Sequence, residues 1–555
     1  MPAIRISGFK GLAPAISPTK LAEGAAQNCL NARVEGSSLV PERQATEVED
    51  LPTGTDSIYK WRVASNEIWL YSTEGESFVE SPVIADVHNR IYIGGGDFPR
   101  YSAYAVATSG WQAGQPIVSN PQVPTTTYRL GVPAPSEAPS VQKIGTPDEA
   151  TVDVIYTTSY VFTYVTQYGE EGPPSAPTSL IEWQEGHTKR VNFPTNPTGN
   201  YAFGAGSLKR IYRTATGSSS TEFLFVGECP IAQDEFNDTL MDSELGEVMP
   251  STNWYRPLDD DLEYAPDGPL KKLVLMPGGF LAGFAGKNVA FSEAYLPHAW
   301  NPANTLTTES EIVTIVSTTF GLVVLTKTRP YVAVGTTPDV MSLALLDINQ
   351  ACLSAKSAVE LDGEVIYASP DGLVSIRGNQ TQLITDGLIT RRQWQAYNPS
   401  TMIATSFEGR YYAFYNDGTN TRALIYDRQS PDAPLMELEL YAKTFFEDAE
   451  DDALYMNVDD KLVTFGTGNT YEMTWKSKKY FLPVDMTLAW GRVIADGRVQ
   501  FRIYMDGVKV FDRRVEDEVE FRLPPKTRGR ELEVEIVEAP HRIDQIVIAT
   551  DRAET

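Results

Sequence analysis

The segment SEAYLPHAWN (Ser292–Asn301) gathers side chains of the types that do acid–base or nucleophilic chemistry. It holds His298, one of four histidines in 555 residues, and three further reactive side chains, those of Ser292, Glu293 and Tyr295. A serine, a histidine and a carboxylate make a hydrolase triad only in a defined geometry, and no GxSxG nucleophile elbow is present. We therefore interpret His298 as a structural residue in a loop ordered by Pro297 and Trp300, at the edge of a β-hairpin.

Other candidate sites are equally isolated. The other histidines lie in three separate regions, at His88, His187 and His541. The cysteines show no CxxC or Cys/His spacing; they are Cys29, Cys229 and Cys352. These spacings argue against a zinc site and against a disulfide framework. The glycines of YIGGGDFPR are not followed by Lys-Ser/Thr and a helix, so a strand-end turn is favoured over a phosphate site. We assign no catalytic, cofactor-binding or metal-ligating residue and no cofactor, and we predict that the chain is not an enzyme.

Acidic clusters leave two alternatives open. They are Asp259–Glu263, Glu447–Asp452 and Val458–Asp460. Carboxylates suit Ca²⁺, but none of the clusters fits the twelve-residue calcium loop, so solvated loops are favoured. A glycosidase needs two carboxylates on facing walls, and the sequence singles out no such pair.

The net charge of −27 limits the kinds of partner that the chain can bind. It argues against a DNA clamp, which needs Lys and Arg to neutralise phosphates. It is compatible with a surface past which DNA slides, and equally with a role in solubility alone. The start, MPAIRISGFKGLAP, lacks a signal-peptide pattern, and no run approaches the roughly 20 apolar residues of a membrane span. We expect a soluble protein made in the cytoplasm.

The elements that must position these residues are mostly short strands. Few segments show helical periodicity. The best is Ser17–Val34, with Ser17 as cap, Pro18 at the first helical position, and Leu21, Ala25 and Cys29 on one face. From Ile58, and again after Leu270, units of about 30–45 residues each hold two or three strands joined by tight turns, as in propeller blades. We predict five to seven blades, with one or two of them supplied by Ile58–Ala107.

Two regions break this pattern. The strictly alternating strand at Tyr160–Gln167 and the hairpin Leu208–Pro230 around TGSSST, after a Pro-rich linker, predict an inserted fibronectin- or immunoglobulin-like sandwich. The hairpin VQFRIYMDGVKVFDRRV (Val499–Val515) belongs to a C-terminal β-sandwich. The predicted fold is all-β, divided into an N-terminal arm with a short helix (1–50), first propeller strands (51–128), the inserted sandwich (129–250), the remaining blades (251–476) and the terminal sandwich (477–555).

Several motifs resemble those of a family of tailed-bacteriophage virion proteins, similar to the tail nozzle (tail tubular protein) of short-tailed phages. The N-terminal signature is carried by Gly11, Pro14, Pro18, Leu21, Ala26, Gln27, Asn28 or Asn31, Leu39 and Pro41. Further matching stretches follow in the same order: Phe162–Pro177, Arg210–Gly217, Met276–Trp300, Thr326–Pro338, Ala368–Val374 and Ser477–Pro483. The resemblance covers nearly the whole chain.

The resemblance implies a virion tail protein made in the host bacterial cytoplasm. Its partners would be further copies in a homohexameric ring, the portal or adaptor, other tail proteins and fibre or spike proteins. Phage DNA would pass through the lumen without sequence-specific binding, and no membrane insertion is implied. The family has no catalytic residues to transfer. Glu447–Asp452 and Asp259–Glu263 are candidates for an acidic lumen lining.

The alternative is a carbohydrate-binding or carbohydrate-cleaving propeller protein, acting as a receptor-binding or depolymerase tail component. Such a protein is more usually a trimer with a repetitive shaft and an exposed groove of aromatic and carboxylate side chains. No shaft repeat is visible in the sequence.

Overall fold

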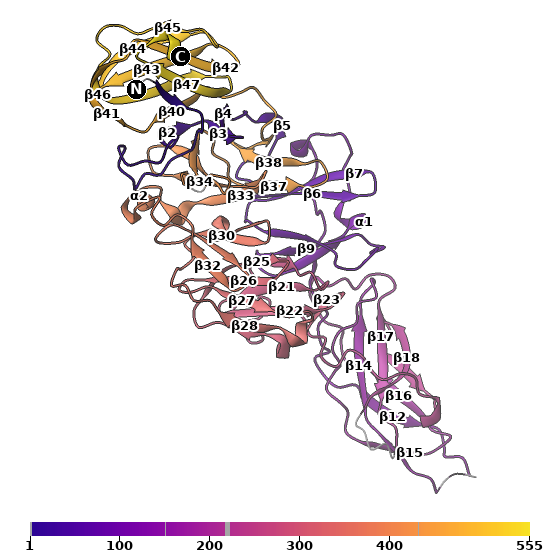
Figure 1. The fold of residues 1–555 in the computed structure, drawn as a ribbon. Helices are drawn as coiled ribbons and strands as arrows, with labels where there is room; N and C mark the ends of the chain where they lie inside the picture. The colour runs from indigo at the N-terminus through magenta and orange to yellow at the C-terminus, as the bar shows by residue number, and fades with distance from the viewer. Residues whose placement is uncertain (1–2, 150, 152, 217–221, 431) are drawn as a thin grey trace.

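The computed structural model of the chain describes residues 3–149, 151, 153–216, 222–430 and 432–555. The described chain is all-β, with a propeller-like core, an inserted sandwich and a terminal sandwich. Figure 1 shows an elongated molecule with the terminal sandwich at one end, the inserted sandwich at the other and the propeller between them. The α-helices of the described residues are α1 (Tyr104–Ala107) and α2 (Arg391–Ala396). Short 3₁₀ turns are η1 (Ile117–Ser119), η2 (Asp242–Glu244), η3 (Pro302–Asn304), η4 (Pro338–Val340), η5 (Ala355–Ser357), η6 (Pro399–Thr401) and η7 (Arg552–Glu554).

The core consists of seven blades, counted over the described residues: six separate sheets and the four strands β33–β36 of a ten-stranded sheet that continues into the terminal sandwich. The first blade is β6 (Ser57–Val63) and β7 (Asn66–Ser72); the second is β8 (Ser77–Glu80), β9 (Arg90–Gly94), β10 (Arg100–Ala103) and β11 (Tyr128–Arg129). The third is β20 (Leu273–Leu275), β21 (Leu281–Ala285), β22 (Asn288–Glu293), β23 (Leu296–Trp300) and β24 (Leu306–Thr307). The fourth is β25 (Ile312–Thr318), β26 (Gly321–Thr326), β27 (Tyr331–Val334) and β28 (Ser342–Leu345).

The remaining blades complete the ring. The fifth is β29 (Val359–Leu361), β30 (Glu364–Ala368), β31 (Leu373–Arg377) and β32 (Gln380–Leu383); the sixth is β33 (Ile403–Phe407), β34 (Arg410–Asn416), β35 (Thr421–Asp427) and β36 (Leu435–Leu438). The seventh is β37 (Phe445–Asp448), β38 (Ala453–Val458) and β39 (Lys461–Thr464), joined by β5 (Thr46–Asp50) from the N-terminal segment. The first strands of successive blades contact one another. The contacts run from β8 to β20, β25, β29, β33 and β37, and from β37 to β6 of the first blade. The strands in Ile58–Ala107 therefore belong to two blades, within the predicted range.

The insert leaves the second blade after β11 and returns before β20. Its strands are β12 (Ser140–Ile144), β13 (Tyr156–Thr158), β14 (Tyr160–Val165), β15 (Ile181–Trp183), β16 (Thr188–Asn192), β17 (Leu208–Arg213), β18 (Leu224–Pro230) and β19 (Glu235–Asp238). Sheet β12-β16-β19 shares a core with sheet β14-β17-β18, where Val191 packs with Tyr160 and Ile211, so the insert is a sandwich. The predicted β17–β18 hairpin is present, although its tip, residues 217–221, lies outside the described residues.

The terminal sandwich combines both ends of the chain. Its strands are β1 (Ala3–Ile6), β2 (Ala26–Leu30), β3 (Ala32–Glu35), β4 (Ser38–Pro41), β40 (Met473–Ser477), β41 (Tyr480–Thr487), β42 (Trp490–Ala495), β43 (Val499–Met505), β44 (Val508–Val515), β45 (Phe521–Arg522), β46 (Arg528–Ala539) and β47 (Ile543–Ala549). Strand β1 pairs with β47, and β2 pairs with β40 on one side and β36 of the sixth blade on the other. The N-terminal segment thus joins the terminal sandwich to the propeller.

The predicted N-terminal helix over Ser17–Val34 is wrong, since this segment forms a turn-rich stretch followed by β2 and β3. Gly24 has φ +79°, a left-handed conformation that interrupts a helix. Pairing with β40 then satisfies the backbone of Ala26–Leu30. Leu21 and Ala25 are buried in one cluster and Cys29 in another, so sheet pairing overrides the local periodicity.

The predicted loop around His298 is also wrong, because Leu296–Trp300 is strand β23, paired with β22. Pro297 is tolerated because β23 lies at the edge of its sheet, where a missing N–H removes no ladder bond. The predicted hairpin before it is confirmed: β21 and β22 are joined by the GKN turn, with Gly286 at φ +54°.

No helix in the described parts of the chain is long and apolar enough to cross a membrane.

Candidate functional site

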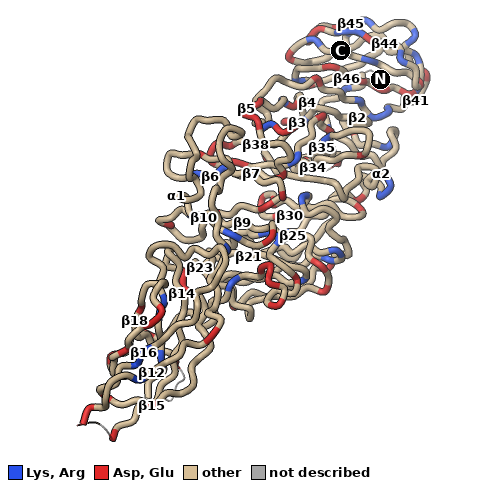
Figure 2. Tube along the Cα trace, turned by 180° about the vertical axis from the view of Figure 1, so that it is seen from behind, with Lys and Arg blue, Asp and Glu red and all other residues tan. Residues whose placement is uncertain are grey.

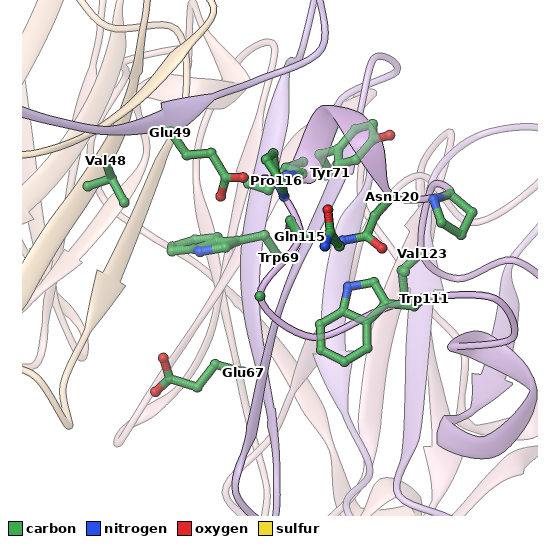
Figure 3. A pocket seen from close by; sticks show the side chains of 13 residues that line it. Val48, Glu49, Glu67, Trp69, Tyr71, Trp111, Gln115, Pro116, Asn120 and Val123 are labelled. Carbon is green, nitrogen blue, oxygen red and sulfur yellow. Dashed lines mark hydrogen bonds between the residues drawn. The ribbon is translucent and has the colours of Figure 1, made fainter.

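An aromatic pocket lies beside the first blade, where β5 and β7 meet the loop that follows α1 (Figure 3). Its volume is about 420 Å³, within the usual range for small-ligand pockets. The lining comes from β5 (Val48, Glu49), β7 (Glu67, Trp69, Tyr71) and the loop (Trp111, Gly114, Gln115, Pro116, Ile117, Asn120, Pro121, Val123). The pocket therefore combines large rings with carboxylates and amides, a set suited to ligands that have both apolar faces and hydroxyl groups.

Trp69 is held in place by aromatic side chains of the seventh blade. Its ring packs edge-to-face on Tyr455 at a centroid distance of 4.9 Å and on Phe446 at 5.9 Å. Trp69 and Tyr71 are two residues apart on β7, so both project to the same side of the strand. Figure 3 shows Trp69 and Trp111 with Gln115 between them in this view. The rings are thus supported by packing before any ligand arrives.

The loop that carries Trp111 is fixed by hydrogen bonds. Asn120 Oδ1 accepts from the backbone N–H of Gln112 at 2.9 Å, and its Nδ2 donates to the carbonyl of Gln115 at 3.0 Å. The Glu49 carboxylate accepts from the backbone N–H of Ile117. The side chains of Glu49 and Asn120 therefore serve to shape the pocket wall.

Glu67 is committed to an ion-pair cluster. It lies 3.0 Å from Lys60 Nζ and 3.0 Å from Arg62 Nε. The hydrogen bond from Lys60, followed by that from Arg62, lowers the pKa of Glu67 below its usual range. A general acid for glycoside cleavage needs a raised pKa, so Glu67 is unsuited to that role.

His298 is not brought together with a nucleophile. It is buried at the contact between the third blade and the inserted sandwich, 6.0 Å centroid-to-centroid from Trp254. Ser292 Oγ instead accepts from the Leu281 N–H at 2.9 Å and donates to the Glu293 carbonyl at 3.2 Å. Asn304 donates to Glu293 Oε1 at 3.4 Å. The structural role of His298 stays a prediction.

The acidic clusters form ion pairs within the chain. Arg129 bonds Asp260 at 2.7 and 2.8 Å, and Arg256 bonds Asp259 at 2.9 Å and Asp261 at 2.6 Å. In Glu447–Asp452, Asp448 is buried against Lys60 and Arg62. Within the described residues, no group of three or more His, Cys, Asp or Glu is arranged to hold a metal ion.

Sequence reasoning missed the aromatic pocket. One signal was available, because EIWLYST places Trp69 and Tyr71 at alternating positions of a strand. No sequence pattern indicated that Trp111 lines the pocket, because its loop reaches the pocket only through tertiary packing.

No known family model and no curated protein matches the chain. Among solved structures, the extracellular domain of a hybrid two component system from B. thetaiotaomicron is 10% identical, with a TM-score of 0.29 over 96% of this chain and 80% of that one. An exo-beta-1,3-galactanase from Phanerochaete chrysosporium is 9% identical, with a TM-score of 0.17 over 91% of this chain and 99% of that one.

Proposed function

We propose that the chain is a structural component of a bacteriophage tail, one copy of a nozzle ring that surrounds part of the DNA ejection channel below the portal or adaptor. The resemblance of its motifs to tail-nozzle proteins supports this role. The observation that carries it in the structure is the inserted sandwich, which projects from the propeller away from the terminal sandwich (Figure 1). A body with a rigid centre and a module at each end suits repeated side-by-side contacts between copies.

The insert is fixed to the propeller by a buried ion cluster. Arg90 of β9 bonds Asp86 at 2.7 Å and Glu170 of the insert at 2.6 Å. The Tyr101 hydroxyl of β10 donates to the same Glu170 carboxylate at 2.7 Å. Breaking one partner of a buried charge cluster costs about 3–5 kcal/mol, so this junction favours one orientation of the insert. A fixed orientation is what a closed ring of identical copies requires.

The test is the mass and symmetry of the purified protein and of the virion tail. Native mass spectrometry and electron microscopy should show a six-fold ring. Glu170→Gln should weaken ring formation by loosening the junction, whereas Glu228→Gln, an exposed substitution on the same insert, should leave it intact. A chain that stays monomeric even within purified tails, or a trimer that cleaves glycans, would overturn the proposal.

A second candidate function, carbohydrate binding, is favoured by the aromatic pocket. The Trp69 and Trp111 rings, with the amides of Gln115 and Asn120 nearby, are suited to sugar faces and hydroxyls. A panel of neutral and acidic oligosaccharides should then quench tryptophan fluorescence, and Trp111→Ala should reduce binding at least about tenfold. Tyr295→Ala, an exposed aromatic of the third blade, is the control. Absence of binding by the wild-type chain to every oligosaccharide would remove this candidate.

A further inference from the structure

A second cavity lies on the axis of the propeller. Its volume is about 980 Å³, and it is lined by the start of every blade. The contributing elements are β6, β8, β20, β25, the turn before β29, β33 and β37, together with Phe284 of β21. A ring of inner strands leaves such a channel at its centre, and each blade presents its first strand to it.

Four lysines line this channel in a chain of net charge −27: Lys271, Lys272, Lys356 and Lys443. Figure 2 shows acidic and basic positions along the whole length of the molecule, so the chain has no single basic domain. Two of the four are neutralised within the chain. Lys356 pairs with Asp56, and Lys443 pairs with Asp460 at 3.2 Å.

The carboxylates of the lining are also engaged. Glu76 pairs with Arg100 at 2.7 Å, and Glu80 accepts a hydrogen bond from the Tyr59 hydroxyl at 3.0 Å. Neither forms an ion pair with a lysine of the channel within the described residues. The lining therefore contains acids, but they do not compensate Lys272.

Lys272 has no carboxylate partner among the described residues. Its Nζ donates to Thr314 Oγ1 of the fourth blade at 3.4 Å. Desolvation lowers the pKa of Lys272 to about 8. The neighbouring Cys352 thiol supplies no negative charge, because burial raises its pKa to about 12. A desolvated ammonium without a counter-charge is costly, and an oxyanion placed beside it would offset that cost.

We propose that the axial channel is a binding site for a small oxyanion, a carboxylate or phosphate group, held by the Lys272 ammonium with the Thr314 hydroxyl as a second donor. Lys271, the residue before it in the chain, is exposed and also lines the channel. The channel, at about 980 Å³, has room for a small organic molecule that carries the anionic group. This site is separate from the aromatic pocket and does not depend on ring assembly.

The proposal is tested on the full chain with two probes, inorganic phosphate and citrate. Calorimetric titration should detect binding of at least one, and Lys272→Met should weaken it about tenfold or more, as expected for loss of a charge-assisted hydrogen bond. Lys509→Met is the matched control, since Lys509 lies on the terminal sandwich and pairs with Asp512 at 2.6 Å. Binding of phosphate alone or citrate alone would identify the anionic group.

A measurement on the wild-type chain covers the case in which Lys272→Met fails to fold. Acetylation of Lys272, followed by mass spectrometry at pH 8, should be slowed by the bound probe, while acetylation of Lys509 should not change. No binding of either probe at tens of millimolar, equal binding by the Lys272→Met chain, or unprotected acetylation would overturn the proposal.

Discussion

At the residue scale, His298 connects two parts of the molecule. Its ring lies beside Trp254, and its Nε2 has no hydrogen-bond partner among the described residues. Desolvation lowers the pKa of His298; Glu170 acts to raise it and Arg90 to lower it. The side chain is thus suited to be neutral in the folded chain at neutral pH.

This burial predicts a pH dependence with a definite sign. In the unfolded chain the His298 pKa is near 6.5, above its folded value, so the unfolded state binds the proton more readily. The free energy of unfolding at the contact between the third blade and the insert should therefore fall as the pH drops below about 6.5. Thermal unfolding followed by tryptophan fluorescence between pH 5 and 7.5 should show this slope, and His298→Gln should reduce it. His541→Gln, on the terminal sandwich, should retain it; an unchanged slope in His298→Gln would contradict the assignment.

Asp448 is the central acceptor between the first and seventh blades. Arg62 bonds both of its oxygens at 2.6 Å, and Lys60 lies at 3.2 Å. Burial raises the pKa of Asp448, but the hydrogen bonds from Arg62 and Lys60 outweigh it and hold the pKa below its usual range. The carboxylate is therefore ionised over the whole physiological range, and it ties together the two blades at which the ring closes.

Asp448→Asn should destabilise the chain by about 1–3 kcal/mol, because Lys60 and Arg62 lose their buried acceptor and keep only the more exposed carboxylates of Glu67 and Asp451. The stabilising contribution is present above the unfolded pKa of about 3.9 and is lost as the pH falls through the lower folded value. Urea unfolding at pH 7 measures the loss. Asp452→Asn, an exposed change in the same hairpin, should cost less than about 0.5 kcal/mol. Equal urea midpoints for the Asp448→Asn and Asp452→Asn chains would show that the ion-pair cluster does not stabilise the propeller.

At the scale of elements, Gly24 sets the path of the N-terminal segment. Its φ is +79°, and a Cβ there would lie 1.6 Å from the Gly8 carbonyl oxygen. Gly36 also has a positive φ, +55°, but a Cβ there would meet no atom within 4 Å. Gly36→Ala should cost about 1 kcal/mol from backbone strain alone, and Gly24→Ala should cost clearly more. Differential proteolysis of the N-terminal segment measures this; equal susceptibility would contradict the close approach.

Hairpins were predictable where the alternation of the strands and the turn between them lie in one short stretch of sequence. The β21–β22 and β43–β44 hairpins follow from alternation around the turns GKN and MDG. The partners of the N-terminal strands were not predictable, because β1 pairs with β47 from the opposite end of the chain and no local pattern specifies that choice. The same reason hid the channel, whose lining comes from every blade.

At the scale of the whole molecule, the ring of blades is closed by a strand from the other end of the chain. β5 completes the seventh blade by pairing with β39, from Thr46 opposite Thr464 to Asp50 opposite Lys461. The segment before β5 belongs to the terminal sandwich, so closing the propeller and docking that sandwich use the same stretch of chain. The two parts should therefore unfold together, and the insert, attached at one junction, should unfold separately.

Net charge gives the last prediction, which concerns assembly. Each copy carries −27, so copies brought side by side repel one another, and the repulsion is screened over about 10 Å at 0.1 M salt. If apolar and hydrogen-bonded contacts hold the ring, added salt should strengthen association. Sedimentation velocity at 0.02, 0.15 and 0.5 M NaCl should then show a growing oligomer fraction at fixed protein concentration. The Asp50→Asn chain, one charge less negative, serves as a matched reference and should associate slightly more readily at low salt. A ring that dissociates as salt is raised would instead mean that opposite charges across the interface hold it, and the apolar-contact account of assembly would be wrong.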